Sequence, residues 1–164
     1  MSTETIQDLF EHGLEDIYHA EHELLDALED LEEHTEDDEI AQAFAEHRQE
    51  TEDQIDRLEQ VFEEFGAPPE KEECEGIEGL ISEYEGFLET DPDQNVLDYH
   101  NMAAAEKTEH YEIAAYGNLI PLAGQLGLDD AADMLEDNLR EEQDALEKLK
   151  ELTESYDMES IPSQ

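Results

Sequence analysis

The sequence of 164 residues has no tryptophan, one cysteine and few basic residues. The single cysteine, Cys74, excludes an internal disulfide and suits a reducing compartment. No basic stretch followed by an apolar run stands near the amino terminus, so we expect no secretory signal. The apolar runs are too short to span a bilayer. These absences favour a cytoplasmic protein.

Acidic residues dominate the charge, with 51 Asp and Glu against 7 Lys and Arg, a formal net charge of −44. Such a chain excludes nucleic acid and anionic membranes as electrostatic partners. Acidic chains with few aromatics are often disordered, but here the apolar residues recur at helical spacing, which favours a folded protein with an acidic surface. Salt shortens the screening length from about 10 Å at 0.1 M to about 3 Å at 1 M. We therefore predict a halophilic protein that loosens in dilute buffer.

The apolar spacing predicts an all-α fold with four long helices and one short one. Their expected ranges are about 5–34, 35–65, 74–88, 93–125 and 129–155. Short loops make hairpins of the first two and the last two long helices, while the connection from residue 70 to about 92 allows a crossover. We expect a ferritin-like four-helix bundle with the short helix in that crossover. Residues 1–156 would form one domain and 157–164 a frayed tail.

Acidic or imidazole side chains interrupt the apolar face of each long helix near its middle. The interruptions are Glu21, His47 with Glu50, Glu109 with Glu112, and Glu142. Because mid-helix positions face each other in antiparallel hairpins, all four sets can meet at one level of the core. Carboxylate-bridged two-metal sites need this arrangement, one Glu from each of two helices and a pair of ligands one turn apart on each of the others. The sequence therefore predicts two divalent ions bound by Glu21, His47, Glu50, Glu109, Glu112 and Glu142.

The order of these ligands departs from the usual Glu-x-x-His. His47 precedes Glu50, and Ala145 stands three residues after Glu142. A carboxylate-rich, histidine-poor site suits Fe(II), Mn(II) or Mg(II) better than zinc or copper. The competing interpretation is that, among 51 acidic residues, some reach a helix face by chance, and that His47 is a hydrogen-bonded core histidine. Asp16 and His110 lie at the edges of the apolar faces, where they would orient ligands or make ordinary contacts.

Several segments resemble the YciE/YciF-type ferritin-like family. They are Asp16–Glu21, Ala43–Gln54, Cys74–Ile81, Glu109–Gly117 and Gln125–Gly127. The resemblance implies a rubrerythrin-like bundle with a two-metal centre, a homodimer and a link to stress responses, without an established reaction. The family's motif carboxylates would fall on Glu21, Glu50, Glu109, Glu112 and Glu142. Pro121 departs from the family pattern, and we expect it to bend or loosen the end of its helix.

Two functions follow as expectations. The first is a protein that holds two iron or manganese ions and oxidises Fe(II), or reduces peroxide or dioxygen. The second is a non-enzymatic structural or interaction bundle whose carboxylate cluster is empty or holds a redox-silent ion. Metal analysis of protein purified in high salt separates them.

Overall fold

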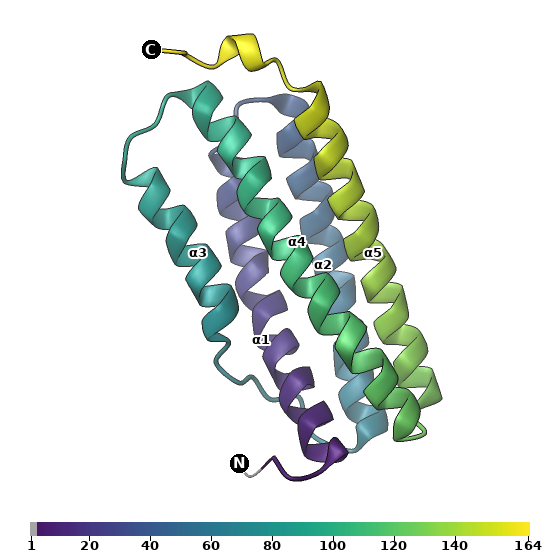
Figure 1. The fold of residues 1–164 in the computed structure, drawn as a ribbon. Coiled ribbons are helices and arrows are strands. Elements are labelled where there is room, and N and C mark those ends of the chain that lie inside the picture. Colours follow the sequence, from purple (N-terminus) through teal and green to yellow (C-terminus); the bar gives the residue numbers. More distant parts are fainter. Residues whose placement is uncertain (1–2) are drawn as a thin grey trace.

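The computed structural model describes residues 3–164, which form long helices and no strand (Figure 1). The elements are α1 (Ile6–Glu33), α2 (Asp38–Phe65), α3 (Glu75–Leu88), α4 (Gln94–Gln125), α5 (Asp129–Ser155) and a short 3-10 turn, η1 (Met158–Ser160). The predicted all-α class and the extra helix in the crossover are confirmed. Within this described part, no helix combines the length and the apolar character that crossing a membrane requires.

The helix ends follow local sequence signals. Thr5 and Asp8 form a capping box, in which each side chain accepts a hydrogen bond from the other residue's backbone N–H. Gly66 closes α2 with a φ of 89°, a left-handed conformation that glycine adopts without steric cost. At the start of α2 the cap is Asp37, while the hydroxyl of Thr35 instead donates to the carbonyl of Leu31.

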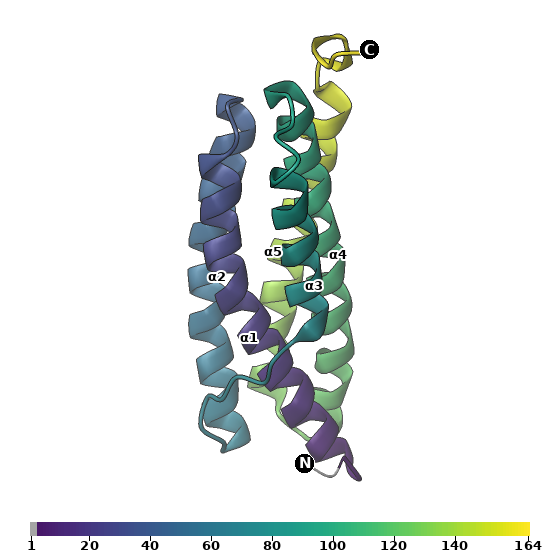
Figure 2. The same cartoon turned by 90° about the vertical axis from the view of Figure 1, so that its left-hand side faces the viewer.

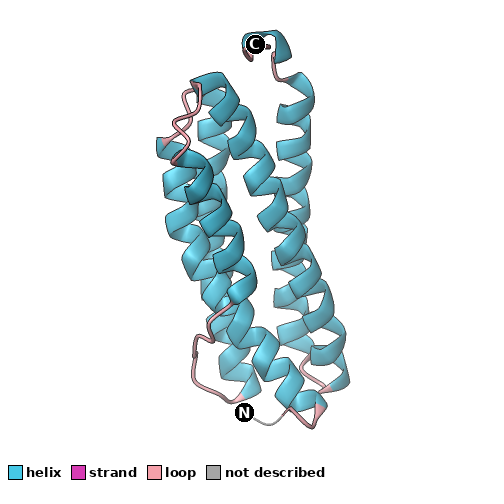
Figure 3. Ribbon diagram, turned by 60° about the vertical axis from the view of Figure 1, so that its left-hand side comes forward, coloured by secondary structure: helices cyan, strands magenta, loops and turns pink. Residues whose placement is uncertain are grey.

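The four long helices run antiparallel to their neighbours. α1 and α2 form one hairpin and α4 and α5 the other, and α2 also packs on α5 as α1 does on α4. Figure 2 shows the two hairpins as two layers, with α3 lying outside along α1 and α4. The crossover that carries α3 returns the chain to the opposite end of the bundle before α4 begins, and Figure 3 shows the other connections confined to the bundle ends. The ferritin-like connectivity expected from the loop lengths is present.

The apolar core consists of two clusters. One, which includes Phe10, Leu58 and Leu135, fills the end of the bundle near the amino terminus. The other, which includes Phe44 and Leu149, fills the opposite end. Buried polar side chains lie between the two clusters, at mid-height of the helices. The apolar clusters thus supply the packing that holds a polar layer away from water.

Pro121 does not end its helix. α4 continues through it to Gln125, and Pro121 itself is exposed. A proline lacks the N–H that would bond the carbonyl four residues earlier, Gly117, whose residue is also exposed. Because water can satisfy that carbonyl, the helix tolerates the proline in its last turns.

Candidate metal centre

Four of the predicted ligands are buried carboxylates at the middle of three helices. Glu21, Glu109, Glu112 and Glu142 are at most 1% exposed. His47, from α2, is also buried and brings an imidazole into the same layer. Glu50 differs, because its side chain is 48% exposed and lies at the rim.

The imidazole of His47 is the centre of this cluster. Its Nε2 lies 3.0 Å from Oε1 of Glu109 and 3.4 Å from Oε2 of Glu142. Its Nδ1 lies 3.3 Å from Oε2 of Glu50, so the ring bridges the buried carboxylates and the rim. One ligand atom from each of His47, Glu109, Glu112 and Glu142 lies within 4.8 Å of the other three. This spacing is small enough for a single cation to reach all four.

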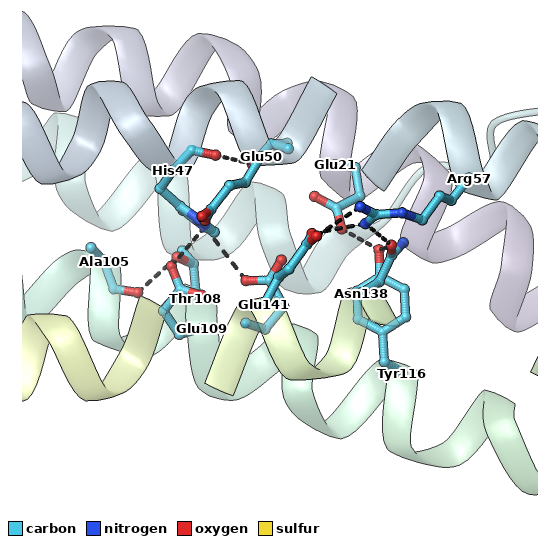
Figure 4. A network of polar contacts seen from close by, with 12 residues as sticks. Glu21, His47, Glu50, Arg57, Ala105, Thr108, Glu109, Tyr116, Asn138 and Glu141 are labelled. Carbon is cyan, nitrogen blue, oxygen red and sulfur yellow. Dashed lines mark hydrogen bonds and ion pairs between the residues drawn. The ribbon is translucent and has the colours of Figure 1, made fainter. Parts of the chain in front are cut away.

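Glu21 approaches the cluster from α1 and is held by a tyrosine. The hydroxyl of Tyr116 donates a hydrogen bond to Oε1 of Glu21. The amide of Asn138 donates to the same hydroxyl at 3.2 Å, and Nη1 of Arg57 donates to Oδ1 of Asn138 at 2.8 Å. Figure 4 shows this chain of contacts beside His47 and Glu109. The buried carboxylate is therefore linked, residue by residue, to a guanidinium near the surface.

Burial and mutual repulsion govern the proton affinities of the layer. Burial raises the pKa of Glu21 to about 7. Burial, followed by the charges of neighbouring carboxylates, raises the pKa of Glu112 well above its usual range, and burial does the same for Glu142. Burial opposes ionisation of Glu109 as well, but the facing His47 and a hydrogen bond with Glu142 together outweigh it and lower the pKa. Burial likewise disfavours the imidazolium of His47, yet Glu109 and Glu142 raise its pKa well above the ordinary value.

The buried oxygens fit a bound cation. Six carboxylate oxygens have no hydrogen-bond partner: Oε2 of Glu21, Oε2 of Glu109, and both oxygens of Glu112 and of Glu142. An unpaired buried polar group costs about 1–3 kcal/mol, and more when it is charged. Carboxylate oxygens with one imidazole are the donors that iron and manganese accept. A divalent ion would satisfy these oxygens and offset their charge.

The two predicted orienting residues lie elsewhere. Asp16 accepts a hydrogen bond of 2.7 Å from the hydroxyl of Tyr111, whose oxygen also lies 2.7 Å from Sγ of Cys74. His110 is exposed on the outer face of α4. Within residues 3–164, no hydrogen bond joins either residue to the buried carboxylates.

Asn138 and Arg57 also belong to the network, although neither is among the predicted site residues. In the last helix the buried residue at this level is Asn138, whereas the neighbouring Leu139 is half-buried. The spacing Ala131, Leu135, Asn138, Glu142 alternates steps of four and three, so helical spacing alone could have found it. Nothing in the sequence marks Arg57, which reaches Asn138 across 81 residues.

The family follows from the sequence and the fold together. A model described as "Domain of unknown function (DUF892)" matches residues 5–160. The chain belongs to the DUF892 family. It is 42% identical over 153 residues to Protein YciF of Escherichia coli (strain K12), which covers 93% of this chain and 92% of that protein. The predicted resemblance is thereby confirmed.

Solved structures agree with this DUF892 fold. The crystal structure of the E. coli stress protein YciF matches with a TM-score of 0.90 and 41% identity, covering 94% of this chain and 98% of that one. YcfI of Rhodopseudomonas palustris, described as a putative structural protein, matches with a TM-score of 0.87 and 42% identity, covering 90% and 94%. A protein of Xanthomonas campestris, 22% identical with a TM-score of 0.75 over 92% and 93% of the chains, shares the fold.

Proposed function

We propose that this DUF892 protein binds two iron or manganese ions in the buried layer and acts on Fe(II), peroxide or dioxygen in a stress response. The observation that carries the proposal is the set of six buried carboxylate oxygens without a hydrogen-bond partner beside His47. The name of the E. coli relative, a stress protein, supports the physiological context. A cytoplasmic location accords with the single cysteine.

Charge balance favours two ions over one. Glu21, Glu109, Glu112 and Glu142 bring four negative charges when ionised, which two divalent cations neutralise. One divalent ion would offset only two of these charges. The other two carboxyl groups would then stay protonated, or would be buried as anions with no cation beside them. When bound, an iron or manganese pair supplies one-electron and two-electron redox chemistry.

The chain's own residues hold and orient the site. Glu109, Glu112 and Glu142 present oxygens toward Nε2 of His47, and Glu21 presents its free Oε2 from the opposite helix. Glu50, although predicted as a ligand, lies where it can accept the Nδ1–H of His47 and so leave Nε2 free as a ligand atom. We assign Glu50 this orienting role.

Metal analysis of protein purified in high salt tests the proposal. We expect two equivalents of iron or manganese, lost in Glu109→Ala and kept in Glu33→Ala, which removes an exposed carboxylate of α1. Turnover needs its own measurement, the consumption of oxygen or peroxide on adding Fe(II). Protein that stays free of iron and manganese when both are supplied contradicts the proposal.

A structural or interaction bundle is the second candidate. It is favoured by the R. palustris relative, which is described as a putative structural protein. In that case the site would be empty, with the same stability with and without added metal, or it would hold a redox-silent ion. The homodimer implied by the family resemblance stays a prediction for both candidates, and light scattering in high salt measures it against the 18.8 kDa of one chain.

A further inference from the structure

A cavity of about 130 Å³ leads from the surface to the imidazole side of the buried layer. It lies between α2, α4 and α5, and His47 and Glu109 line its inner end. Its outer end carries exposed acidic side chains, Glu46, Glu50 and Asp144. The cavity therefore connects the solvent with the candidate metal ligands.

Three alanines leave this space open. Ala43, Ala105 and Ala145 come from the three helices that surround the cavity. Ala145 stands one turn after Glu142, where a Glu-x-x-His pair would place a second imidazole. The missing ring thus leaves an open approach on the same side as His47.

We propose that this cavity binds a small neutral molecule, of the size of dioxygen or hydrogen peroxide, next to the metal centre. The inference rests on the proposed function, because the inner end of the cavity is made by two of its ligands. An engineered cavity of about 150 Å³ holds one benzene, so a volume of about 130 Å³ is ample for a molecule of two to four atoms.

The chemistry of the walls disfavours an anionic occupant. The alanines are joined by Phe44 and Leu149, which give the cavity apolar sides. Three exposed carboxylates at its mouth against one cation, Lys148, and the charge of −44 on the whole chain repel anions. A neutral molecule such as dioxygen or hydrogen peroxide is not repelled by these charges, whereas an anion such as azide or a carboxylate is.

Nitric oxide is the probe, because it is a neutral diatomic whose complex with Fe(II) has a visible absorption band and an N–O stretching band. Protein loaded with Fe(II) without oxygen is titrated with nitric oxide, and this nitrosyl signal is measured by visible absorption and infrared spectroscopy. Iron content is determined in parallel for each variant. We expect Ala145→Leu, which adds three carbon atoms inside the cavity, to keep its iron and lose the nitrosyl signal.

Two further variants make the result decisive. Ala43→Leu fills the same cavity from α2, and it serves if Ala145→Leu does not fold. Ala114→Leu adds the same atoms on the exposed face of α4 and should keep both iron and signal. An iron-loaded wild type without a signal, or a signal that survives both cavity-filling variants, overturns the inference while leaving the metal site standing. Protein that takes up neither iron nor manganese overturns both.

Discussion

Replacing Glu21 by glutamine should stabilise the metal-free protein at neutral and alkaline pH. Burial raises the pKa of Glu21 from 4.5 to about 7, so the folded state keeps a proton that the unfolded state has released. The stability that this carboxyl contributes to the folded state is therefore fully present below pH 4.5 and is lost as the pH rises to about 7. At about 1.36 kcal/mol for each pKa unit, the loss is about 3 kcal/mol.

Glutamine keeps the shape of glutamate and an acceptor for the hydroxyl of Tyr116, but carries no charge at any pH. At pH 8 the metal-free Glu21→Gln protein should be about 3 kcal/mol more stable than the wild type. For a chain of this length that is a rise in Tm of about 6–12 °C. At pH 5 the difference should shrink to below about 1 kcal/mol, because the wild-type carboxyl is then protonated in the folded state.

The assay is thermal unfolding of both proteins in high salt with a chelator, between pH 5 and pH 8. Glu33→Gln removes the same charge from an exposed position of α1 and corrects for the general repulsion of the acidic surface. With iron or manganese present the order should reverse, because glutamine removes a ligand. The reasoning is wrong if Glu21→Gln destabilises the metal-free protein at pH 8. It is also wrong if Glu21→Gln and Glu33→Gln change the stability equally at every pH, because Glu21 would then not be a buried carboxylate without a compensating charge.

Three other predictions concern the surface and the crossover. Arg57→Leu should lower the free energy of unfolding, measured in urea, by about 1–3 kcal/mol, because it leaves Oδ1 of buried Asn138 without its donor. The control Arg140→Leu removes a side chain that is 62% exposed and should lower it by less than about 1 kcal/mol. Raising KCl from about 0.1 M to about 2 M should raise the Tm, since screening weakens the repulsion among 51 acidic residues, and an unchanged Tm would contradict salt adaptation. Cys74 should react with a thiol reagent only as the protein opens, because it is 2% exposed and burial raises the pKa of its thiol; labelling of the native protein as fast as of the urea-unfolded chain would refute this.

The sequence was sufficient for the fold because its signals are local. The capping pair of Thr5 and Asp8 and the terminating Gly66 lie within a few residues of the helix ends that they set. The length of the crossover then determined which helices pair. At Pro121 the local rule overstated the disturbance, because the carbonyl that loses its partner belongs to exposed Gly117 and lies within reach of water.

The candidate site could be predicted only in part from such local signals. Helical spacing shows which face a residue is on, and it placed Glu21, Glu109, Glu112 and Glu142 inside. It does not fix how far a side chain reaches toward the solvent, so Glu50 was assigned to the interior although it lies at the rim. Contacts between distant helices, such as those of Arg57, depend on which turns come into register, and no single helix carries that information.

The crossover divides the polypeptide into two hairpins, and each hairpin carries only part of the candidate metal ligands. The first supplies Glu21 and His47, and the second supplies Glu109, Glu112 and Glu142. An ion bound by donors from both hairpins would hold the two hairpins together. Cutting the chain within residues 67–73 should therefore give two fragments that recombine far more readily when iron or manganese is supplied, and the ion would then serve as a cofactor of assembly.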